Sequence, residues 1–124
     1  QAYLQAPSGG PLVQDALRAM LELYKQGKIT LEKIVEKMAH NPAICFEVEK
    51  RGFIREGYWA DLVLVNLNKP AEVTRSGVLS KCGWSPFEGT VFTSSVESTI
   101  VSGNLAFHLG QLLPGTGKRL TFAR

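Results

Sequence analysis

Apolar residues recur at every third or fourth position over the first 50 residues, a spacing that predicts amphipathic helices. Pro11 suits the first turn of such a helix, and Gly27 suits the left-handed residue that ends it. Thr30 is a residue type that caps helices, and Asn41-Pro42 predicts the start of a third, short helix. The two longer apolar stripes are Leu12, Val13, Ala16, Leu17, Met20, Leu21 and Tyr24, followed by Leu31, Ile34, Val35 and Met38.

After Gly52 the apolar pattern changes to the short runs that are typical of strands. The strongest run lies between Ala60 and Val65, and its continuity predicts a strand that is buried on both faces. Ser102-Gly103-Asn104 has the composition of a hairpin turn. Further strands are expected over residues 53–54, 72–79, 91–107 and 119–122. The sequence therefore predicts a helical part followed by a part made of strands and turns.

The composition is close to that of an average globular domain, with 44% hydrophobic and 20% charged residues in a chain of 124. The apolar runs are much shorter than the ~18 residues of a membrane-spanning helix, so a membrane partner is not expected. The net charge of +3 is spread among mixed charges, which argues against a nucleic-acid partner. Two cysteines without a Cys-x-x-Cys motif predict reduced thiols and a cytoplasmic location. The sequence opens on Gln1 without an initiator Met, which we interpret as the start of a fragment.

Residue types that carry out hydrolytic chemistry are present, but the pattern does not assemble them into an active site. The histidines His40 and His108 have no metal-ligand spacing; we expect His40 at a helix C-terminus and His108 in an exposed loop. Ser80, Cys82 and Ser85 are nucleophiles by type only, because nothing in the sequence places a base beside them. No complete active site is therefore expected within this chain.

Other candidates favour structural roles. Cys45 lies on an apolar helix face, which predicts a core position. Asp61 precedes the strongest strand, where it is expected to accept a backbone N–H or to bind a cation. Gly115-Thr116-Gly117-Lys118 has part of the composition of a phosphate loop, but the earlier glycine, the following helix and the hydroxyl residue after the lysine are missing. A surface turn is the favoured interpretation of this segment.

The segment Ala6-Pro7-Ser8-Gly9-Gly10 is a loop of small residues that leads directly into the first predicted helix. Small side chains let backbone N–H and C=O groups approach a ligand, and a helix N-terminus favours an anion. By itself this pattern is also that of a plain connecting loop.

Six stretches of the sequence form a recognisable series: residues 6–14, 41–43, 52–57, 60–65, 81–89 and 100–104. Taken in order, they resemble the C-terminal portion of the dihydroorotases, which belong to the amidohydrolase superfamily. The Asn-Pro-Ala and Gly-x-Ile-x-x-Gly-x-x-Ala-Asp-Leu motifs are shared with allantoinases and hydantoinases, whereas the Ala-Pro-Ser-Gly-Gly-Pro loop favours dihydroorotase.

The resemblance implies an α+β fragment, in which the closing helices of a (β/α)8 TIM barrel are followed by part of a small β-sandwich. Residues 1–50 would be the last barrel loop and its helices, and residues 51–124 the C-terminal sandwich part and tail. The stripe of Leu17, Met20, Leu21 and Tyr24 would then face the absent barrel. Active sites of such barrels lie on loops at the strand C-termini, and residues 1–10 would be one of these loops.

The resemblance also implies a zinc-dependent, reversible hydrolysis of the cyclic amide of dihydroorotate to N-carbamoyl-aspartate in pyrimidine biosynthesis. The family's metal ligands, histidines with a carboxylated lysine and an aspartate, are expected upstream of Gln1, so the fragment alone would be inactive and bind no zinc. The residues that carry over are those whose backbone would bind the substrate ring, Ala6, Pro7, Ser8 and Gly9, with Ser8 and Gly9 first among them.

Two alternatives remain open at this stage. One is a sister cyclic amidohydrolase, such as an allantoinase or a dihydropyrimidinase (hydantoinase). The other is a non-catalytic, β-rich interaction module whose exposed apolar helix faces form an interface. The expected partner in the enzyme case is the small-molecule substrate, and a homo-oligomer is compatible with it.

Overall fold

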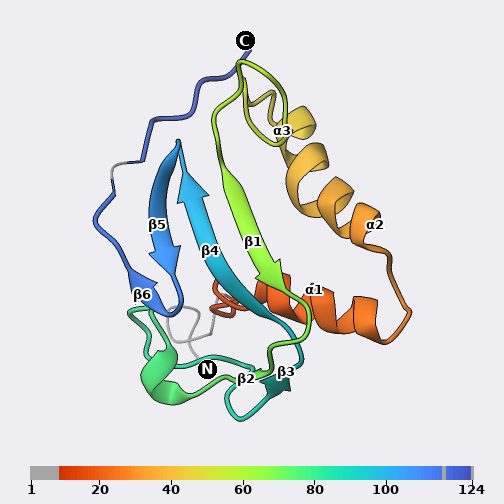
Figure 1. Cartoon of the computed structure of the whole chain (residues 1–124), viewed down its shortest axis with the longest axis vertical. Coiled ribbons are helices and arrows are strands. Elements are labelled where there is room, and N and C mark those ends of the chain that lie inside the picture. Colours follow the sequence, from red (N-terminus) through yellow and green to blue (C-terminus); the bar gives the residue numbers. More distant parts are fainter. Residues whose placement is uncertain (1–8, 116, 124) are drawn as a thin grey trace, which may run out of the picture.

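A computed structural model describes residues 9–115 and 117–123 of the chain. Figure 1 shows two helical segments on one side of an antiparallel sheet, with the C-terminal end at the top of the view. The first helix, α1 (Ala16–Lys25), buries Leu21, which is 3% exposed. Leu21 therefore packs within this chain, and the prediction that it faces an absent barrel is wrong for that residue.

The C-terminal end of α1 agrees with the sequence-based prediction, whereas its N-terminal end does not. Gly27 has φ +71° and its N–H donates to the Tyr24 carbonyl at 2.9 Å, as predicted for the residue that ends this helix. The regular helix starts at Ala16 and not at Pro11. The reason is a tight turn, in which the Leu12 N–H donates to the Gly10 carbonyl at 2.9 Å and holds these residues out of helical geometry.

The second helical segment is continuous where the sequence predicted a break. It consists of α2 (Leu31–Val35), the π-helix η2 (Glu36–His40) and α3 (Asn41–Cys45). The Thr30 hydroxyl accepts the Lys33 N–H at 3.2 Å, which confirms the predicted cap. Asn41 makes no capping bond, because the chain widens into a π turn before Pro42, which has no N–H to donate.

The sheet contains four antiparallel strands in the order β1-β4-β5-β6. Its first hairpin turns at Ser102 and Gly103, with φ +51° and +83°, and this confirms the predicted turn. Irregularities in pairing occur between Leu64 and Val65 and between Thr99 and Ile100. The strands are β1 (Leu62–Asn66), β4 (Ser95–Val101), β5 (Asn104–His108) and β6 (Gln111–Leu112).

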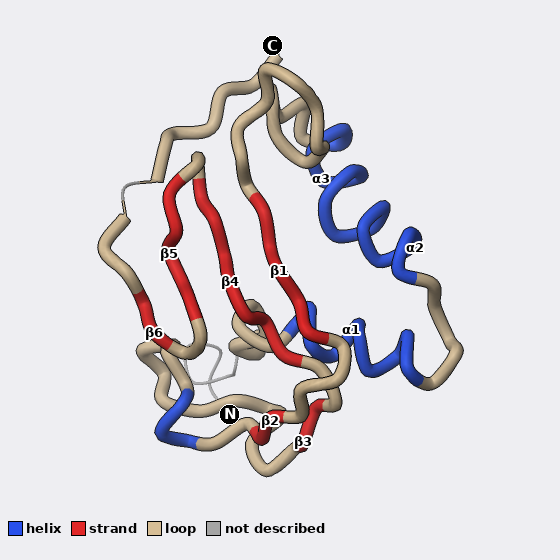
Figure 2. The backbone as a smooth tube through the Cα atoms, viewed as in Figure 1, coloured by secondary structure: helices blue, strands red, loops and turns tan. Residues whose placement is uncertain are grey.

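A second, two-stranded sheet pairs β2 (Ala71–Glu72) with β3 (Val91–Phe92). Between them run the 3-10 helix η3 (Arg75–Gly77) and a long loop, which Figure 2 shows beneath the main sheet. The predicted strand over 72–79 is therefore wrong beyond Glu72. Bends take the place of the strand expected at Phe53-Ile54, and the expected strand over 119–122 is reduced to a single bridge between Val48 and Phe122.

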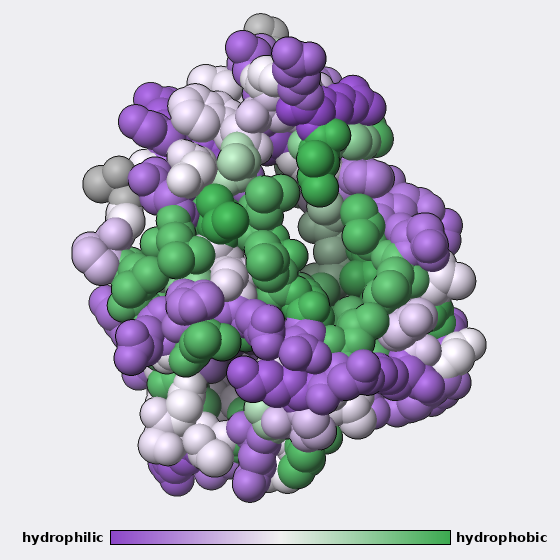
Figure 3. Space-filling view, in the orientation of Figure 1, coloured by the Kyte–Doolittle hydropathy of each residue, from purple (hydrophilic) through white to green (hydrophobic). Residues whose placement is uncertain are grey.

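Strand β1 confirms the strongest strand prediction, but its expected burial is wrong. Val63 and Leu64 are 48% and 50% exposed. Within the described residues β1 pairs with β4 alone and forms one edge of the sheet, so nothing in this part of the chain covers it on the other side. Figure 3 shows hydrophobic side chains gathered over the middle of the sheet and around a hollow beside the α2–α3 segment.

The apolar core is small for a chain of this length. Val13 and Ile54 are 95% and 90% exposed, and Phe46 is 65% exposed. These three side chains therefore contribute little to the core of the described residues. Among the described residues, the buried apolar side chains are Leu21, Ile34, Ala43, Val73 and Phe92.

We expect the isolated 124-residue chain to self-associate and to increase the fluorescence of a hydrophobic dye, because its apolar faces remain in water. Light scattering and dye titration measure both effects. A monodisperse monomer that leaves the dye fluorescence unchanged would contradict the expectation.

Candidate functional site

The predicted substrate loop lies at the N-terminal side of α1. Gly9 and Gly10 are both exposed, whereas Ala6, Pro7 and Ser8 lie outside the described residues. Between Gly10 and the helix, backbone hydrogen bonds link the turn to the first helical residues. The Leu12 carbonyl accepts the N–H groups of Asp15 and Ala16 at 3.1 and 2.8 Å. The loop is thus joined closely to the first turn of α1.

Asp15 is the most deeply buried polar residue of this region, at 1% exposure. Its carboxylate accepts a bond from the Arg18 guanidinium at 3.1 Å and another from the Ser85 hydroxyl at 3.1 Å. The same guanidinium donates to the Ala71 carbonyl and lies over the Phe92 ring, 4.9 Å from its centre. The buried charge of Asp15 is therefore paired, as a buried carboxylate requires.

The side-chain amide of Gln14, the residue before Asp15, both donates and accepts a hydrogen bond. Its Nε2 donates to the Gly77 carbonyl, and its Oε1 accepts the Leu79 N–H, both at 2.8 Å. Sequence patterns alone do not indicate a role for the side chains of Gln14, Asp15 or Arg18. The only signal was an acid and a base spaced by three residues, Asp15 and Arg18, at the start of an apolar stripe.

The candidate nucleophiles are accounted for by contacts with other groups. Ser85 donates to Asp15, and Cys82 lies 3.1 Å from the Ser80 hydroxyl. That hydrogen bond lowers the pKa of the exposed Cys82 thiol below its ordinary value. Neither histidine bonds to Ser80, Cys82 or Ser85 in the described part of the chain, so the structure places no histidine beside these three candidates.

The positions of the two histidines differ from the prediction, fully for His40 and in part for His108. His40 lies inside the continuous α2–α3 segment and not at a helix C-terminus, and its ring stacks on Phe53 at 4.3 Å between centres. His108 is exposed, as predicted, but it ends strand β5 and its Nδ1 lies 2.9 Å from the Ser98 hydroxyl. The predicted core position of Cys45 is also wrong, because the residue is exposed near the end of α3.

No group of three or more His, Cys, Asp or Glu residues is placed to hold a metal ion within residues 9–115 and 117–123. In the same described part of the chain, no helix is both long and apolar enough to cross a bilayer. The segment around Gly115 and Lys118 contains no helix among its described residues, and Thr116 lies outside them.

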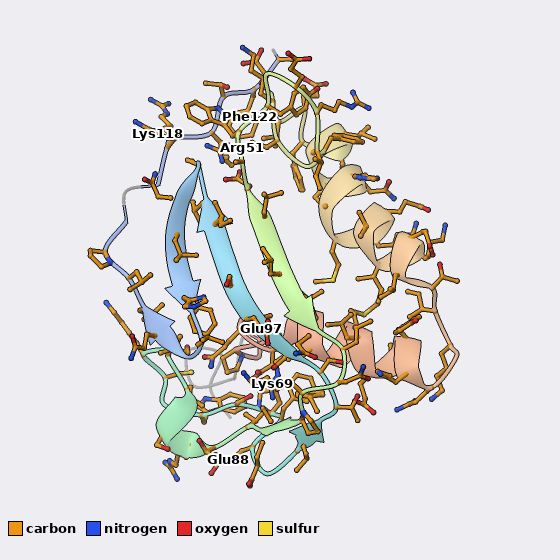
Figure 4. The ribbon with its side chains drawn as sticks, in the orientation of Figure 1. Arg51, Lys69, Glu88, Glu97, Lys118 and Phe122 are labelled. Atoms are coloured by element: carbon orange, nitrogen blue, oxygen red, sulfur yellow. The ribbon has the colours of Figure 1, made fainter. Side chains whose placement is uncertain are left out.

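Asp61 has the structural role that the sequence predicted for it. Its carboxylate accepts the Ser102 N–H at 2.6 Å and pairs with the Arg51 guanidinium, which also donates to the Ser102 hydroxyl at 3.1 Å. Figure 4 shows Arg51 near the top of the view, where the chain approaches strand β1. The cluster joins the segment after α3 to the hairpin between β4 and β5.

A second charged pair lies at the other end of the sheet. Lys69 and Glu97 are 3.9 Å apart, and both are labelled at the lower end of the sheet in Figure 4. Asn66 also donates to Glu97, at 3.0 Å. Lys69 also lines a cavity of about 610 Å³, whose other lining residues come from the start of α1, from the sheet and from the loops beside it. Its lining includes Gln14, Arg18, Thr99, Phe107 and Leu112.

The arrangement of helices and strands matches a known class of enzymes. It is similar to L-hydantoinase (dihydropyrimidinase) from Arthrobacter aurescens, with a TM-score of 0.87 and 29% identity, over 95% of this chain and 27% of that one. The chain thus has the fold of one part of a hydantoinase. The model of the amidohydrolase family matches residues 6–106, and the chain belongs to that family.

Curated relatives agree with the predicted resemblance. A dihydroorotase from Methanothermobacter thermautotrophicus is 32% identical over 113 residues, which is 91% of this chain and 26% of the relative. A dihydroorotase from Halobacterium salinarum is 41% identical over 86 residues, 69% of this chain and 20% of the relative. The chain therefore spans about a quarter or less of the length of these relatives.

Proposed function

We propose that this chain is the closing segment of a dihydroorotase, called the parent here. The parent would catalyse the reversible hydrolysis of the cyclic amide of dihydroorotate to N-carbamoyl-aspartate in pyrimidine biosynthesis. The observation that carries the proposal is the similarity to a dihydroorotase over 91% of the chain. A hydantoinase-type activity is the second candidate, because the same fold occurs in an L-hydantoinase at 29% identity.

In this proposal residues 1–50 are the last loop and closing helices of a TIM barrel, and residues 51–124 belong to a β-sandwich. The backbone of Ala6, Pro7, Ser8 and Gly9 binds the substrate ring. Two features support this role for the loop: its side chains are small, and no described residue beyond its chain neighbours lies within 4 Å of a Cβ built on Gly9. The loop also precedes a helix whose first turn is fixed by buried contacts.

Zinc is the metal that the proposal assigns to the parent. The described residues do not fit a zinc site, because no three potential ligands converge there and His40 and His108 contact Phe53 and Ser98 instead. We therefore assign the metal ligands to the rest of the parent. The proposed partner is a small-molecule substrate, with no role for nucleic acid. The free thiols of Cys45 and Cys82 are consistent with the reducing cytoplasm.

The test compares the full-length parent with the isolated chain. We expect the parent to hydrolyse dihydroorotate in preference to allantoin, hydantoin and dihydrouracil, and to contain stoichiometric zinc. We expect the isolated 124-residue chain to show neither hydrolysis nor stoichiometric zinc. Preference for another cyclic amide would favour the hydantoinase-type candidate, and absence of any hydrolysis by the metal-loaded parent would favour an interaction module. Zinc-dependent turnover by the pure fragment would refute the division of roles.

A further inference from the structure

We propose that Gln14 and Asp15 are positioning residues, which set the place of the substrate loop by fixing the first turn of α1 to residues 71–85. The inference rests on the proposed function, since it assumes that residues 6–9 contact the substrate. It adds a role for the segment that includes η3 and the following loop. That segment would support the binding pocket from a distance without touching the substrate.

The Gln14 amide is the first point of attachment. It bonds to the backbone at Gly77 and Leu79, residues that follow it by 63 and 65 positions in the sequence. Donor and acceptor are both used at 2.8 Å, so the side chain is held in one orientation. Because Gln14 is exposed, this contact contributes little to the apolar core.

Asp15 is the second point of attachment, and it is buried. Its carboxylate receives the Ser85 hydroxyl from one side and the Arg18 guanidinium from the other. The Ser85 oxygen in turn accepts the Phe87 N–H at 3.2 Å, which orders the loop that carries it. Charged hydrogen bonds in a buried setting are among the strongest in proteins. The two attachment points therefore fix adjacent residues of α1 to one stretch of the chain.

The path from these residues to the loop is short. Three residues separate Gly10 from Gln14, and the Leu12 N–H is bonded to the Gly10 carbonyl at 2.9 Å. Gly9 and Gly10 have no side chains that could form stabilising contacts. No described residue beyond its chain neighbours lies within 4 Å of a Cβ built on Gly9. The described end of the loop is thus joined to Gln14 and Asp15 through an ordered turn. Loss of that order would weaken substrate binding more than the chemical step.

The test replaces Gln14 in the full-length parent. We expect Gln14→Leu to raise KM for dihydroorotate about three- to tenfold, the size of one or two lost hydrogen bonds, with kcat and zinc content nearly unchanged. Gln14→Glu keeps the acceptor for Leu79 and loses the donor to Gly77, so its KM should lie in between. The matched control is Gln26→Leu, at the exposed far end of the same helix. It should leave KM unchanged.

A second readout does not depend on the substrate. Hydrogen exchange of peptides covering residues 6–16 should become faster in Gln14→Leu and in Ser85→Ala, while Gln26→Leu behaves as the wild type. Unchanged exchange in folded Gln14→Leu, or a KM that stays within twofold of wild type, would overturn the inference. If the parent prefers another cyclic amide, a raised KM for that substrate supports the positioning role even though the dihydroorotase assignment fails.

Discussion

Gly52→Ala is expected to destabilise the contact between the α2–α3 segment and the residues that follow it by about 2–5 kcal/mol. Gly52 has φ +77°, a conformation that is unfavourable for any residue with a Cβ. A Cβ at this position would lie 2.4 Å from the Cβ of Ala43 and 2.8 Å from the Ala39 carbonyl oxygen. Neither atom can move without displacing the helix. Hydrogen-exchange mass spectrometry of residues 39–52 in the parent measures the local free energy of opening.

Gly27→Ala is the matched control for this substitution. Gly27 has a similar φ of +71°, but nothing lies within 4 Å of a Cβ built there. Its replacement should cost only the backbone term, about 1–2 kcal/mol. Equal effects of the two substitutions would show that the close approach of Gly52 to Ala43 does not matter, and would contradict the prediction.

Asp61→Ala should destabilise the start of β1 and the hairpin at Ser102 by about 2–4 kcal/mol. The Arg51 side chain is only 9% exposed, and it would keep its hydrogen bond to the Ser102 hydroxyl and its place over the Trp59 ring. A buried guanidinium without its carboxylate is the main cost, and the loss of the bond from the Ser102 N–H adds to it. Asp61 itself is 31% exposed, so water offsets part of the penalty.

Glu36→Ala provides a control for Asp61→Ala. Glu36 pairs with Lys33 at 2.7 Å, but both side chains are largely exposed, at 39% and 51%. Such pairs contribute about 0–1 kcal/mol, so the substitution should have little effect on exchange or on the urea midpoint. If Asp61→Ala were as mild as Glu36→Ala, the Arg51–Asp61 contact would behave as a surface pair.

The contacts of Gly52 and Asp61 give a structural reason for the residue types found in the motifs that contain them. Ala43 belongs to the Asn-Pro-Ala motif and Gly52 begins the Gly-x-Ile motif, and the two residues meet where the helix packs on the following chain. Asp61 belongs to the Ala-Asp-Leu part and is joined to Ser102 in the hairpin. The Asn-Pro-Ala, Gly-x-Ile and Ala-Asp-Leu motifs therefore join the helical part to the sheet.

The elements that could be predicted are those whose signals are local. The Thr30 cap, the left-handed Gly27 and the Ser102-Gly103 turn each depend on the conformational preferences of one or two residues. The strand near Leu62 follows from a run of apolar residues in the same way. The helix boundary at Asn41-Pro42 was predicted wrongly, because a π turn accommodates proline without ending the helical segment.

In the candidate site, too, only the features with a local sequence signal could be predicted. The loop at Ala6–Gly9 follows from a resemblance in sequence and remains a prediction, since Gly9 is its only described residue. Gln14 and Asp15 could not be recognised as attachment points, because their partners Gly77, Leu79 and Ser85 lie more than 60 residues away. A pattern within one segment carries no information about a partner at that separation.

The sequence by itself determined the class of most elements and the family of the chain. These properties depend on residue type and short-range spacing. Only the tertiary structure decided which surfaces stay open, which carboxylates are buried and paired, and how the start of α1 is joined to residues 77–85. Those properties depend on distances between residues remote in sequence, and such distances arise only when the chain is folded.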